Sequence, residues 1–346
     1  YIEITGESFK KNTYSMYKNM YTVINGKQYD IVPYNYTNQE IAVAQSKSSL
    51  PYTRFKLKGV KDADQLFCHE LSALLQPMTD AMYSLEAGMG HTPLFNDSGD
   101  NVARSMLSLL AALREEFSIA PVNKNAFPDA GYYCLRHHGL KILMDAGEIA
   151  PDYMPGHGHC DGLSFELSVD QHPVFVNSGT GQYQGSLRGY FRSTRAHNTV
   201  VIEGEEQSEC WGEHRVAKRI SQVSGDCGAD WIHGELVTAT GRQQERMILV
   251  DDQKVIVKDQ VTGSAQAYLH LAPGYEYEGQ DGQVLVKTVD GNVICRIIPE
   301  LSDQIKIHRN GEICSYAPEF GQIMKIQVLE IAWEGDGSEH EIQINW

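Results

Sequence analysis

Residues 156–170 read Gly-His-Gly-His-Cys-Asp-Gly-Leu-Ser-Phe-Glu-Leu-Ser-Val-Asp, a glycine-flanked His-x-His-x-Asp run that continues into an alternating strand. Side chains of an extended chain alternate between two faces, so His157, His159 and Asp161 are predicted to point to one side. Two imidazoles and a carboxylate on one side form a candidate metal or acid/base cluster. The alternative is that the two histidines only cap a strand end through ordinary hydrogen bonds.

The composition is that of an ordinary globular protein, with 346 residues, of which 42% are hydrophobic. A net charge of −16 argues against a nucleic-acid or membrane-surface binder, because such proteins need a positive surface. The longest strongly apolar stretch, 106–113, is too short to cross a bilayer. Residues 1–20 carry no apolar signal-peptide core, and both a cytoplasmic and a bacterial periplasmic location stay open. Seven scattered cysteines predict no disulfide framework.

The spacing of apolar residues changes near residue 126. Before it, helices are predicted over 8–23, 64–85 and 102–117, with Pro77 kinking or breaking the second and Ser98 or Asp100 capping the third. Residues 28–60 are expected to be irregular. After it, short alternating runs separated by turn signals predict antiparallel strands. The expected fold is therefore α+β multidomain, with a helical part over 1–126 and a large antiparallel β-sandwich over 127–346.

Two further segments gather polar groups. Residues 173–183 end a predicted strand at Asn177, and residues 188–199 hold three arginines and a histidine. These are Arg188, Arg192, Arg195 and His197. So many cations in an acidic chain predict an anionic ligand, and the alternative is ordinary ion pairing on a surface strand. His137 and His138 lie on a presumed strand with opposite-facing rings, and they are interpreted as structural.

Four runs resemble the heparinase II/III family of polysaccharide lyases. They are residues 127–133 (FPDAGYY), 156–165 (GHGHCDGLSF), 176–180 (VNSGT) and 190–199 (YFRSTRAHNT). The resemblance is specific over about 127–211 and compatible with that family's β-sandwich as far as the C-terminus. Residues 92–98 (TPLFNDS) are similar to the last helices of its α/α toroid. The resemblance implies a partial α/α toroid followed by the sandwich.

The resemblance also implies β-elimination on a uronic-acid-containing polysaccharide. Charge that builds on the substrate carboxylate must be met by preorganised donors or cations, and the acid and base must be tuned near the working pH. His157 matches the family histidine near that carboxylate. Tyr183 and Tyr190 lie between Asn177 and His197, so they are candidate proton-transferring phenols, with packed tyrosines as the alternative. The candidate substrate-binding residues are Arg188, Arg192, Arg195, His91 and Asn96.

A zinc ion is implied by the same resemblance. His159 and His197 match the family's histidine ligands, and position 177 matches the third ligand, which in the family is usually aspartate. Here it is Asn177, whose neutral carboxamide oxygen is a weaker ligand, so the affinity for zinc should fall or the site should be empty. Asp161 could replace it if the backbone bulges. The alternative is a hydrogen-bonded cluster that braces the sheets, and no organic cofactor is expected.

Three functions follow. The leading one is a polysaccharide lyase that acts on an acidic polysaccharide, with neither nucleic acid nor a membrane as partner. The second is a non-catalytic glycan-binding or structural fragment of such a lyase, because about 125 residues are too few for a full toroid and the upstream acid/base tyrosine cannot be located. The third is a metallohydrolase, whose His-x-His-x-Asp-His pattern fails at Gly162. The polysaccharide and the oligomeric state stay open.

Overall fold

The computed structural model describes residues 2–5, 21–24, 27–33, 52–57, 63–100 and 102–346, with side chains from residue 74 onward. It divides into two compact units, 1–75 and 76–346, and each is described by itself. In the first unit, four strands form an antiparallel sheet in the order β1-β4-β3-β2. The strands are β1 (Ile2–Thr5), β2 (Tyr21–Ile24), β3 (Lys27–Pro33) and β4 (Tyr52–Leu57).

This sheet differs from the helical expectation for the N-terminal part. The last residues of the helix predicted over 8–23 belong to β2, and the region 28–60 contains most of β3 and all of β4. Runs such as Tyr-Thr-Val-Ile are rich in the aromatic and β-branched residues that favour strands, and they are too short to show a clear period. The rest of the predicted helix lies outside the described residues, and the partial toroid stays a prediction.

Helix α3 (Ala63–Leu85) follows the predicted helical spacing and contains Pro77 in its interior. A proline removes one backbone hydrogen bond from a helix but does not have to end it. Of the kink or break predicted at Pro77, the break does not occur, because the helix continues through it. No helix in the described part of the chain is long and apolar enough to cross a membrane.

Helix α4 (Met106–Phe117) begins later than the sequence predicts. Its N-cap is Ser105, whose hydroxyl accepts a backbone N–H of the first turn at 3.3 Å. The expected caps, Ser98 and Asp100, were wrong. The Asp100 carboxylate accepts the backbone N–H of Thr92 at 2.8 Å instead, so it closes its own loop.

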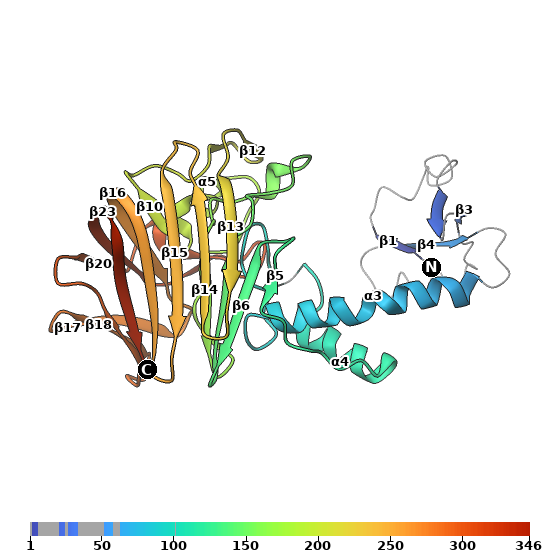
Figure 1. The fold of residues 1–346 in the computed structure, drawn as a ribbon, viewed down its shortest axis with the longest axis horizontal. Coiled ribbons are helices and arrows are strands. Elements are labelled where there is room, and N and C mark those ends of the chain that lie inside the picture. The colour runs from blue at the N-terminus through green and yellow to red at the C-terminus, as the bar shows by residue number, and fades with distance from the viewer. Residues whose placement is uncertain (1, 6–20, 25–26, 34–51, 58–62, 101) are drawn as a thin grey trace. The chain divides into compact units, whose positions relative to one another are not determined.

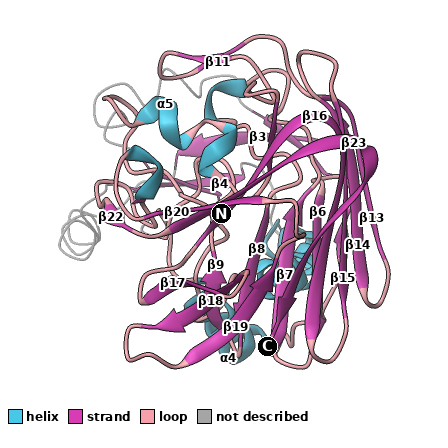
Figure 2. Cartoon of the chain, turned by 90° about the vertical axis from the view of Figure 1, so that its left-hand side faces the viewer, coloured by secondary structure: helices cyan, strands magenta, loops and turns pink. Residues whose placement is uncertain are grey.

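The predicted antiparallel β-sandwich is confirmed in the second unit (Figures 1 and 2). One sheet has five strands in sequence order, and the other has ten, with β16 and β23 as its longest members. The first consists of β5 (Ala126–Phe127), β6 (Tyr132–His137), β7 (Leu140–Asp145), β8 (Phe165–Val169) and β9 (His172–Phe175). Eight strands of the second sheet lie in the order β13 (Ser221–Cys227), β14 (Trp231–Val237), β15 (Gln243–Val250), β16 (Lys254–His270), β23 (Val328–Asn345), β19 (Val293–Ile298), β18 (Gln283–Thr288) and β17 (Tyr275–Gln280). In addition, β10 (Val200–Ile202) pairs with β16, and β20 (Gln304–His308) pairs with β23.

Short elements connect these sheets. They are η2 (Pro155–His157), α5 (Arg188–Phe191), η3 (Thr194–Ala196), β11 (Cys210–Trp211), β12 (Arg215–Val216), η4 (Glu312–Cys314), β21 (Ser315–Tyr316) and β22 (Met324–Lys325). The β7–β8 and β9–β10 connections carry the histidine and arginine runs of the sequence. Loops on a rigid sandwich are a common place for functional residues. These two connections, together with the loop between α3 and α4, supply the polar residues of the candidate site.

The core lies between the two sheets. Alternate residues of the five-stranded sheet, such as Ile142 and Phe165, form one buried cluster with Ile232, Ile248 and Val257 of the larger sheet. This is the packing that period-two alternation predicts for a sandwich. Every cysteine whose side chain is described is a free thiol, as the scattered spacing predicts.

A buried ion pair joins the large sheet to both site loops. Arg246 of β15 is bidentate to Asp259 of β16, with Nε–Oδ1 and Nη2–Oδ2 distances of 2.8 Å. Its Nη1 donates to the carbonyls of Leu163 at 2.8 Å and Asn198 at 2.6 Å. A guanidinium presents its donors in a fixed planar geometry, so this one residue sets the positions of two loop backbones.

Candidate active site

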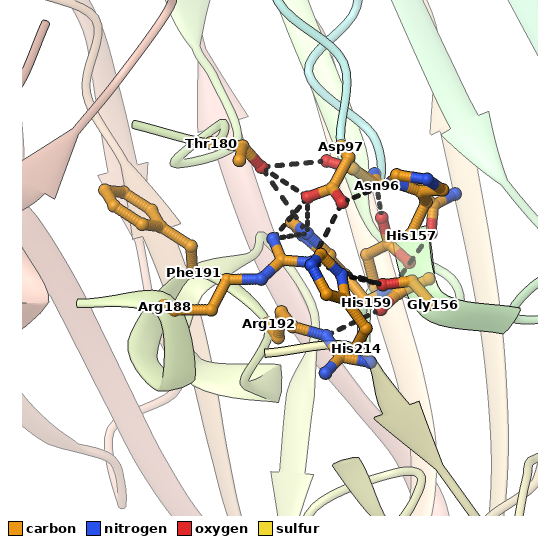
Figure 3. Close-up of polar contacts among 12 residues, drawn as sticks. Asn96, Asp97, Gly156, His157, His159, Thr180, Arg188, Phe191, Arg192 and His214 are labelled. Atoms are coloured by element: carbon orange, nitrogen blue, oxygen red, sulfur yellow. Dashed lines mark hydrogen bonds and ion pairs between the residues drawn. The ribbon is translucent and has the colours of Figure 1, made fainter. Parts of the chain in front are cut away.

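Asp97, in the loop between α3 and α4, is the centre of the polar cluster drawn in Figure 3. Its carboxylate accepts hydrogen bonds from His157 Nδ1 at 2.9 Å, His159 Nε2 at 2.8 Å and Thr180 Oγ1 at 2.9 Å. Arg188 adds a bidentate ion pair, with an Nη2–Oδ2 distance of 2.9 Å. Asp97 lies in the run 92–98 that resembles the family, but the sequence did not single it out as a site residue.

The protonation of this cluster follows from Asp97. Burial alone would raise the pKa of its carboxyl, but hydrogen bonds from His159 and Arg188 outweigh burial and hold that pKa well below its usual range. The ionised carboxylate only accepts hydrogen bonds, so the ring nitrogens that face it, His157 Nδ1 and His159 Nε2, both carry protons. The Nε2 atom of His157 is turned away from Asp97, and so is the Nδ1 atom of His159.

His159, Asp161 and His197 form a second, buried cluster, whose possible ligand atoms lie within 4.8 Å of one another. Burial lowers the pKa of His159 to about 4 and that of His197 to about 3, so both rings are neutral at pH 7. His197 Nε2 donates to the carbonyl of Phe191 at 3.1 Å. The Nδ1 atoms of both rings are buried without a hydrogen-bond partner. Two free imidazole lone pairs beside a carboxylate fit a zinc-type ion.

Asn177 has a different role from the metal ligand that the sequence suggested. Its Oδ1 accepts the hydroxyl of Ser164 at 2.6 Å and the N–H of Asn198 at 3.2 Å. The amide nitrogen is the atom left without a partner, and it is a donor rather than a metal ligand. Asp161 is thus the residue that brings a carboxylate to the two histidines, as the sequence analysis allowed.

His157 does not join the buried cluster. It ends the 3-10 turn η2 instead of lying on an extended strand, so the predicted alternation fails before His159. Its side chain is 53% exposed and lines a groove of about 580 Å³. The groove is also lined by Asn96, Tyr132, Asp129 and Glu148. A metallohydrolase would need both histidines of the His-x-His pair on one metal, and this geometry does not favour it.

Tyr183 lies beside His157, with ring centroids 5.6 Å apart, and Arg188 lies over the tyrosine ring at 5.3 Å. Burial and the Asp97 carboxylate raise the pKa of the phenol against the opposing charge of Arg188, so Tyr183 keeps its proton at neutral pH. His214, in the β11–β12 turn, completes the group at 5.6 Å from Tyr183 and 6.0 Å from His157. A single histidine in a turn gave no signal in the sequence.

Tyr190 occupies the packed position that was the alternative to a catalytic role. It is 2% exposed, and α5 holds it against the protein interior. Its hydroxyl lies 2.9 Å from Ser178 Oγ and donates to the carbonyl of Ile313 at 2.7 Å. Burial raises its pKa far above the usual value. The expectation that Tyr190 transfers a proton to substrate is therefore corrected.

The three arginines hold the site together. Arg188 is buried against Asp97, and Arg192 is buried with two of its nitrogens donating to backbone carbonyls at 3.1 and 3.3 Å. Arg195 forms a partly exposed ion pair with Glu312 at 2.7 Å. Arg188 and Arg192 are thus buried and engaged within the protein, whereas Arg195 is half exposed, and substrate binding by these arginines stays a prediction.

The two predicted loop residues have separate positions. The side chain of His91 is half exposed, and its Nδ1 lies 2.6 Å from the carboxylate of Asp100, away from the His157 groove. Asn96 lies at the site, where its Oδ1 accepts the N–H of His159 at 2.9 Å and its own N–H donates to Asp161 at 2.6 Å. Its φ of 54° is in the left-handed region, which asparagine tolerates better than most residues.

Glu166 is a buried carboxyl behind the site, on the wall of a cavity of about 320 Å³. Its Oε1 accepts the N–H groups of Leu94 at 2.9 Å and Asn177 at 3.1 Å. Burial raises its pKa to about 7 although these hydrogen bonds oppose the shift. The residue connects the loop of Asp97 to the end of β9.

Replacement of Glu166 by glutamine tests this shift. The pKa of the Glu166 carboxyl is raised from 4.5 to about 7 in the folded state. The protonated carboxyl therefore contributes to stability fully below pH 4.5, and this contribution is lost as the pH rises through 7. Relative to wild type, Glu166→Gln should gain roughly 2–3 kcal/mol of unfolding free energy between about pH 5 and pH 8. Urea unfolding at both pH values measures it. The exposed Glu276→Gln is the control, and an equal pH dependence of wild type and Glu166→Gln would contradict the shift.

Comparisons with known proteins agree with this fold. The model of the family described as heparinase II/III-like, C-terminal, matches residues 120–346. The structure of heparan sulfate lyase HepC from Pedobacter heparinus is similar at 15% identity and a TM-score of 0.61, over 80% of this chain and 47% of that one. A heparinase III structure is similar at 18% identity and a TM-score of 0.62, over 82% of this chain and 50% of that one. The chain thus spans about half the length of these proteins. No curated protein matches the sequence.

Proposed function

The chain belongs to the heparinase II/III-like family through its C-terminal domain, and we propose that it cleaves a uronic-acid-containing polysaccharide by β-elimination. The observation that carries this proposal is the exposed His157, which the buried, ionised Asp97 orients at the wall of a groove. A carboxylate that accepts the Nδ1 proton fixes the ring and leaves Nε2 as a proton acceptor. Tyr183 supplies a protonated phenol beside it.

In β-elimination the C5 proton leaves first or together with the bond from C4 to its oxygen. We assign proton removal to His157 Nε2, which the groove exposes to a bound sugar. Tyr183 donates its proton to the departing 4-oxygen, and the product is an unsaturated uronate. Charge on the substrate carboxylate grows during this step and needs a donor or cation close to it. His214, whose ring lies 6.0 Å from that of His157, would supply such a cation in its protonated form, because its Nδ1 is already engaged with the Gly156 carbonyl at 3.3 Å and only a protonated ring has a second N–H.

The charges on the groove wall limit which polysaccharide it can bind. Asp129 and Glu148 lie on its wall together with the polar groups of Asn96 and Tyr132. Carboxylates would repel a densely sulfated chain, so the groove favours a polymer that carries uronate and few sulfates. The solved heparan sulfate lyase and heparinase III share the fold alone at this identity.

The test is the ultraviolet absorbance of the unsaturated uronate during incubation with heparan sulfates of low and high sulfation, chondroitin, hyaluronan and alginate. Dextran, which has no uronate, is the control. A rise with one uronate polymer and none with dextran supports the proposal. Saturable binding of a polymer without any rise would instead favour the non-catalytic glycan-binding role, which fits a chain about half as long as its solved relatives.

We also propose that His159, Asp161 and His197 hold a zinc ion. The unpartnered Nδ1 atoms and the hydrogen bond from His159 Nε2 to Asp97 support this, because metal-bound histidines usually donate their other N–H to a carboxylate or carbonyl. When bound, the ion would supply positive charge that ties the β7–β8 and β9–β10 connections together.

The expected result is that Asp161→Asn weakens zinc binding by at least about tenfold, because a carboxamide is a poorer ligand than a carboxylate. Asparagine keeps an oxygen that can accept the Asn96 N–H, so the fold should survive. The measurement is zinc content after dialysis against graded chelator. Asp129→Asn, in the groove but outside the cluster, is the matched control. Equal zinc retention in both variants and wild type would exclude this ligand set.

A further inference from the structure

A second histidine cluster lies on the surface of the sandwich, outside the site described above. It consists of His137 and His138 at the β6–β7 turn and Asp252 in the turn between β15 and β16. His137 Nε2 lies 3.0 Å and His138 Nε2 lies 3.2 Å from the same oxygen, Oδ1 of Asp252. The sequence suggested rings on opposite faces, and the structure brings both to one point.

The turn explains the difference. His137 pairs with Leu140 across the hairpin, so His138 and Gly139 are the two turn residues, with φ of 42° and 86°. Positive φ at both positions is the pattern of a type I′ turn. Alternation of side chains holds only along an extended strand, and it ends at His137. The two rings therefore meet edge to face with centroids 4.5 Å apart.

The spacing is close to that of a metal site. Ligand atoms on a tetrahedral zinc ion with bonds of about 2.0–2.2 Å are separated by roughly 3.3–3.6 Å. The two N···O distances here are 3.0 and 3.2 Å, so shifts of a few tenths of an ångström would admit an ion between His137, His138 and Asp252. The ligand atoms of all three residues lie within 4.8 Å of one another.

The surroundings also suit a cation. The side chains of His138 and Asp252 are 73% and 78% exposed, so an ion can enter and keep water as a further ligand. Asp251 is the adjacent residue and adds negative charge. Two neighbouring cations are engaged elsewhere, since Arg136 donates to the Tyr83 carbonyl at 2.7 Å and Lys141 pairs with Glu86 at 3.4 Å, while Lys254 acts on Asp251.

We propose that His137, His138 and Asp252 form a surface site for a borderline divalent cation, with Zn²⁺ as the expected occupant. Imidazole and carboxylate ligands suit Zn²⁺, Cu²⁺ and Ni²⁺, whereas Ca²⁺ and Mg²⁺ prefer oxygen ligands alone. The ion would join a turn of the five-stranded sheet to a turn of the ten-stranded sheet. Binding to the folded state alone raises the melting temperature, so zinc should stabilise the sandwich.

The experiment is calorimetric titration of the chelator-treated chain with Zn²⁺, with wild type compared to His138→Ala and Asp252→Asn. Removal of a residue that only hydrogen-bonds to a metal ligand lowers metal affinity by about 10–100-fold. Removal of a ligand itself should therefore lower the zinc affinity of one bound equivalent by at least about tenfold in each variant. Asp251→Asn is the matched control and should retain that equivalent. The zinc-dependent rise in melting temperature should shrink in the two ligand variants and persist in the control. All three positions are exposed, so the fold should survive each change.

The visible spectrum with Co²⁺ in place of Zn²⁺ gives a second readout, because d–d bands report the ligands directly. Wild-type bands that His138→Ala weakens, while His159 and His197 are intact, would separate this site from the buried cluster. Identical zinc stoichiometry and affinity in wild type, His138→Ala and Asp252→Asn would overturn the proposal. An equal loss in Asp251→Asn would also overturn it, since the cause would then be general surface charge or the turn that the Asp251 carboxylate holds through the N–H groups of Gln253 and Lys254.

Discussion

Replacement of His157 by alanine is expected to lower the rate of β-elimination by roughly 10²–10⁴-fold, the usual contribution of a positioned general base. The ring is half exposed and, within the described part of the chain, it hydrogen-bonds to Asp97 alone, so its loss should leave the free energy of unfolding little changed. The measurement is the initial rate of unsaturated uronate formation on the best polymer of the panel. Melting temperature, recorded on the same samples, separates lost chemistry from lost fold.

His233→Ala is the matched control for this variant. His233 is a partly exposed histidine of β14 that also pairs with a carboxylate, Glu245, at 2.8 Å, but it lies outside the site. It should keep the wild-type rate. Full activity of His157→Ala would remove His157 from the proposed mechanism. Activity lost equally in both variants would point to a general effect of removing a surface imidazole.

Replacement of Asp97 by asparagine is expected to lower the free energy of unfolding by about 3–5 kcal/mol, because it leaves a buried cation without its counter-ion. Arg188 is 2% exposed, and its remaining acceptors are the backbone carbonyls of Glu213 at 2.9 Å and Gly156 at 3.3 Å. The new amide group would also face N–H donors. Urea unfolding of wild type and variant measures the loss.

Asp152→Asn is the control for this second experiment. Its carboxylate pairs with Arg219 at 2.8 Å, but the aspartate is 95% exposed, so its neutralisation should leave stability nearly unchanged. If Asp97→Asn changed the free energy of unfolding as little as Asp152→Asn, the central position of Asp97 in the cluster would be contradicted. Asp97→Asn should also lose lyase activity, because His157 would no longer be held in one orientation.

The sandwich strands were predictable because their signal is local. Alternating runs predict strands over 131–136, 140–146, 163–169 and 173–177, within two residues of the bounds of β6 to β9, and the two runs predicted over 253–260 and 265–271 form the single strand β16. The site loops were predictable for a similar reason, since the histidine run at 156–161 and the arginine run at 188–199 are unusual in composition. The same local reasoning missed β2 to β4, although β3 with seven residues is longer than the located strands β8 and β9.

The sequence could predict which residues lie together where few residues of the required type are available. His159 and His197 are indeed neighbours, with ring centroids 5.3 Å apart, as the resemblance implied. Tyr183 and Tyr190 could not be told apart in the sequence, because both are tyrosines in the same connection. Burial separates them, since Tyr190 is 2% exposed and Tyr183 lies beside the exposed ring of His157.

The amino-acid sequence alone is enough to predict the β-sandwich, the negative net charge and two of the loops that form the candidate site. Long-range contacts settle the rest. Asp97 meets His159 across 62 positions of sequence, and His137 meets Asp252 across 115. Periodicity records which face of an element is buried, but it holds no information about which distant loop packs against that face. The partners of a buried charge are therefore fixed only when the sheets and loops have come together.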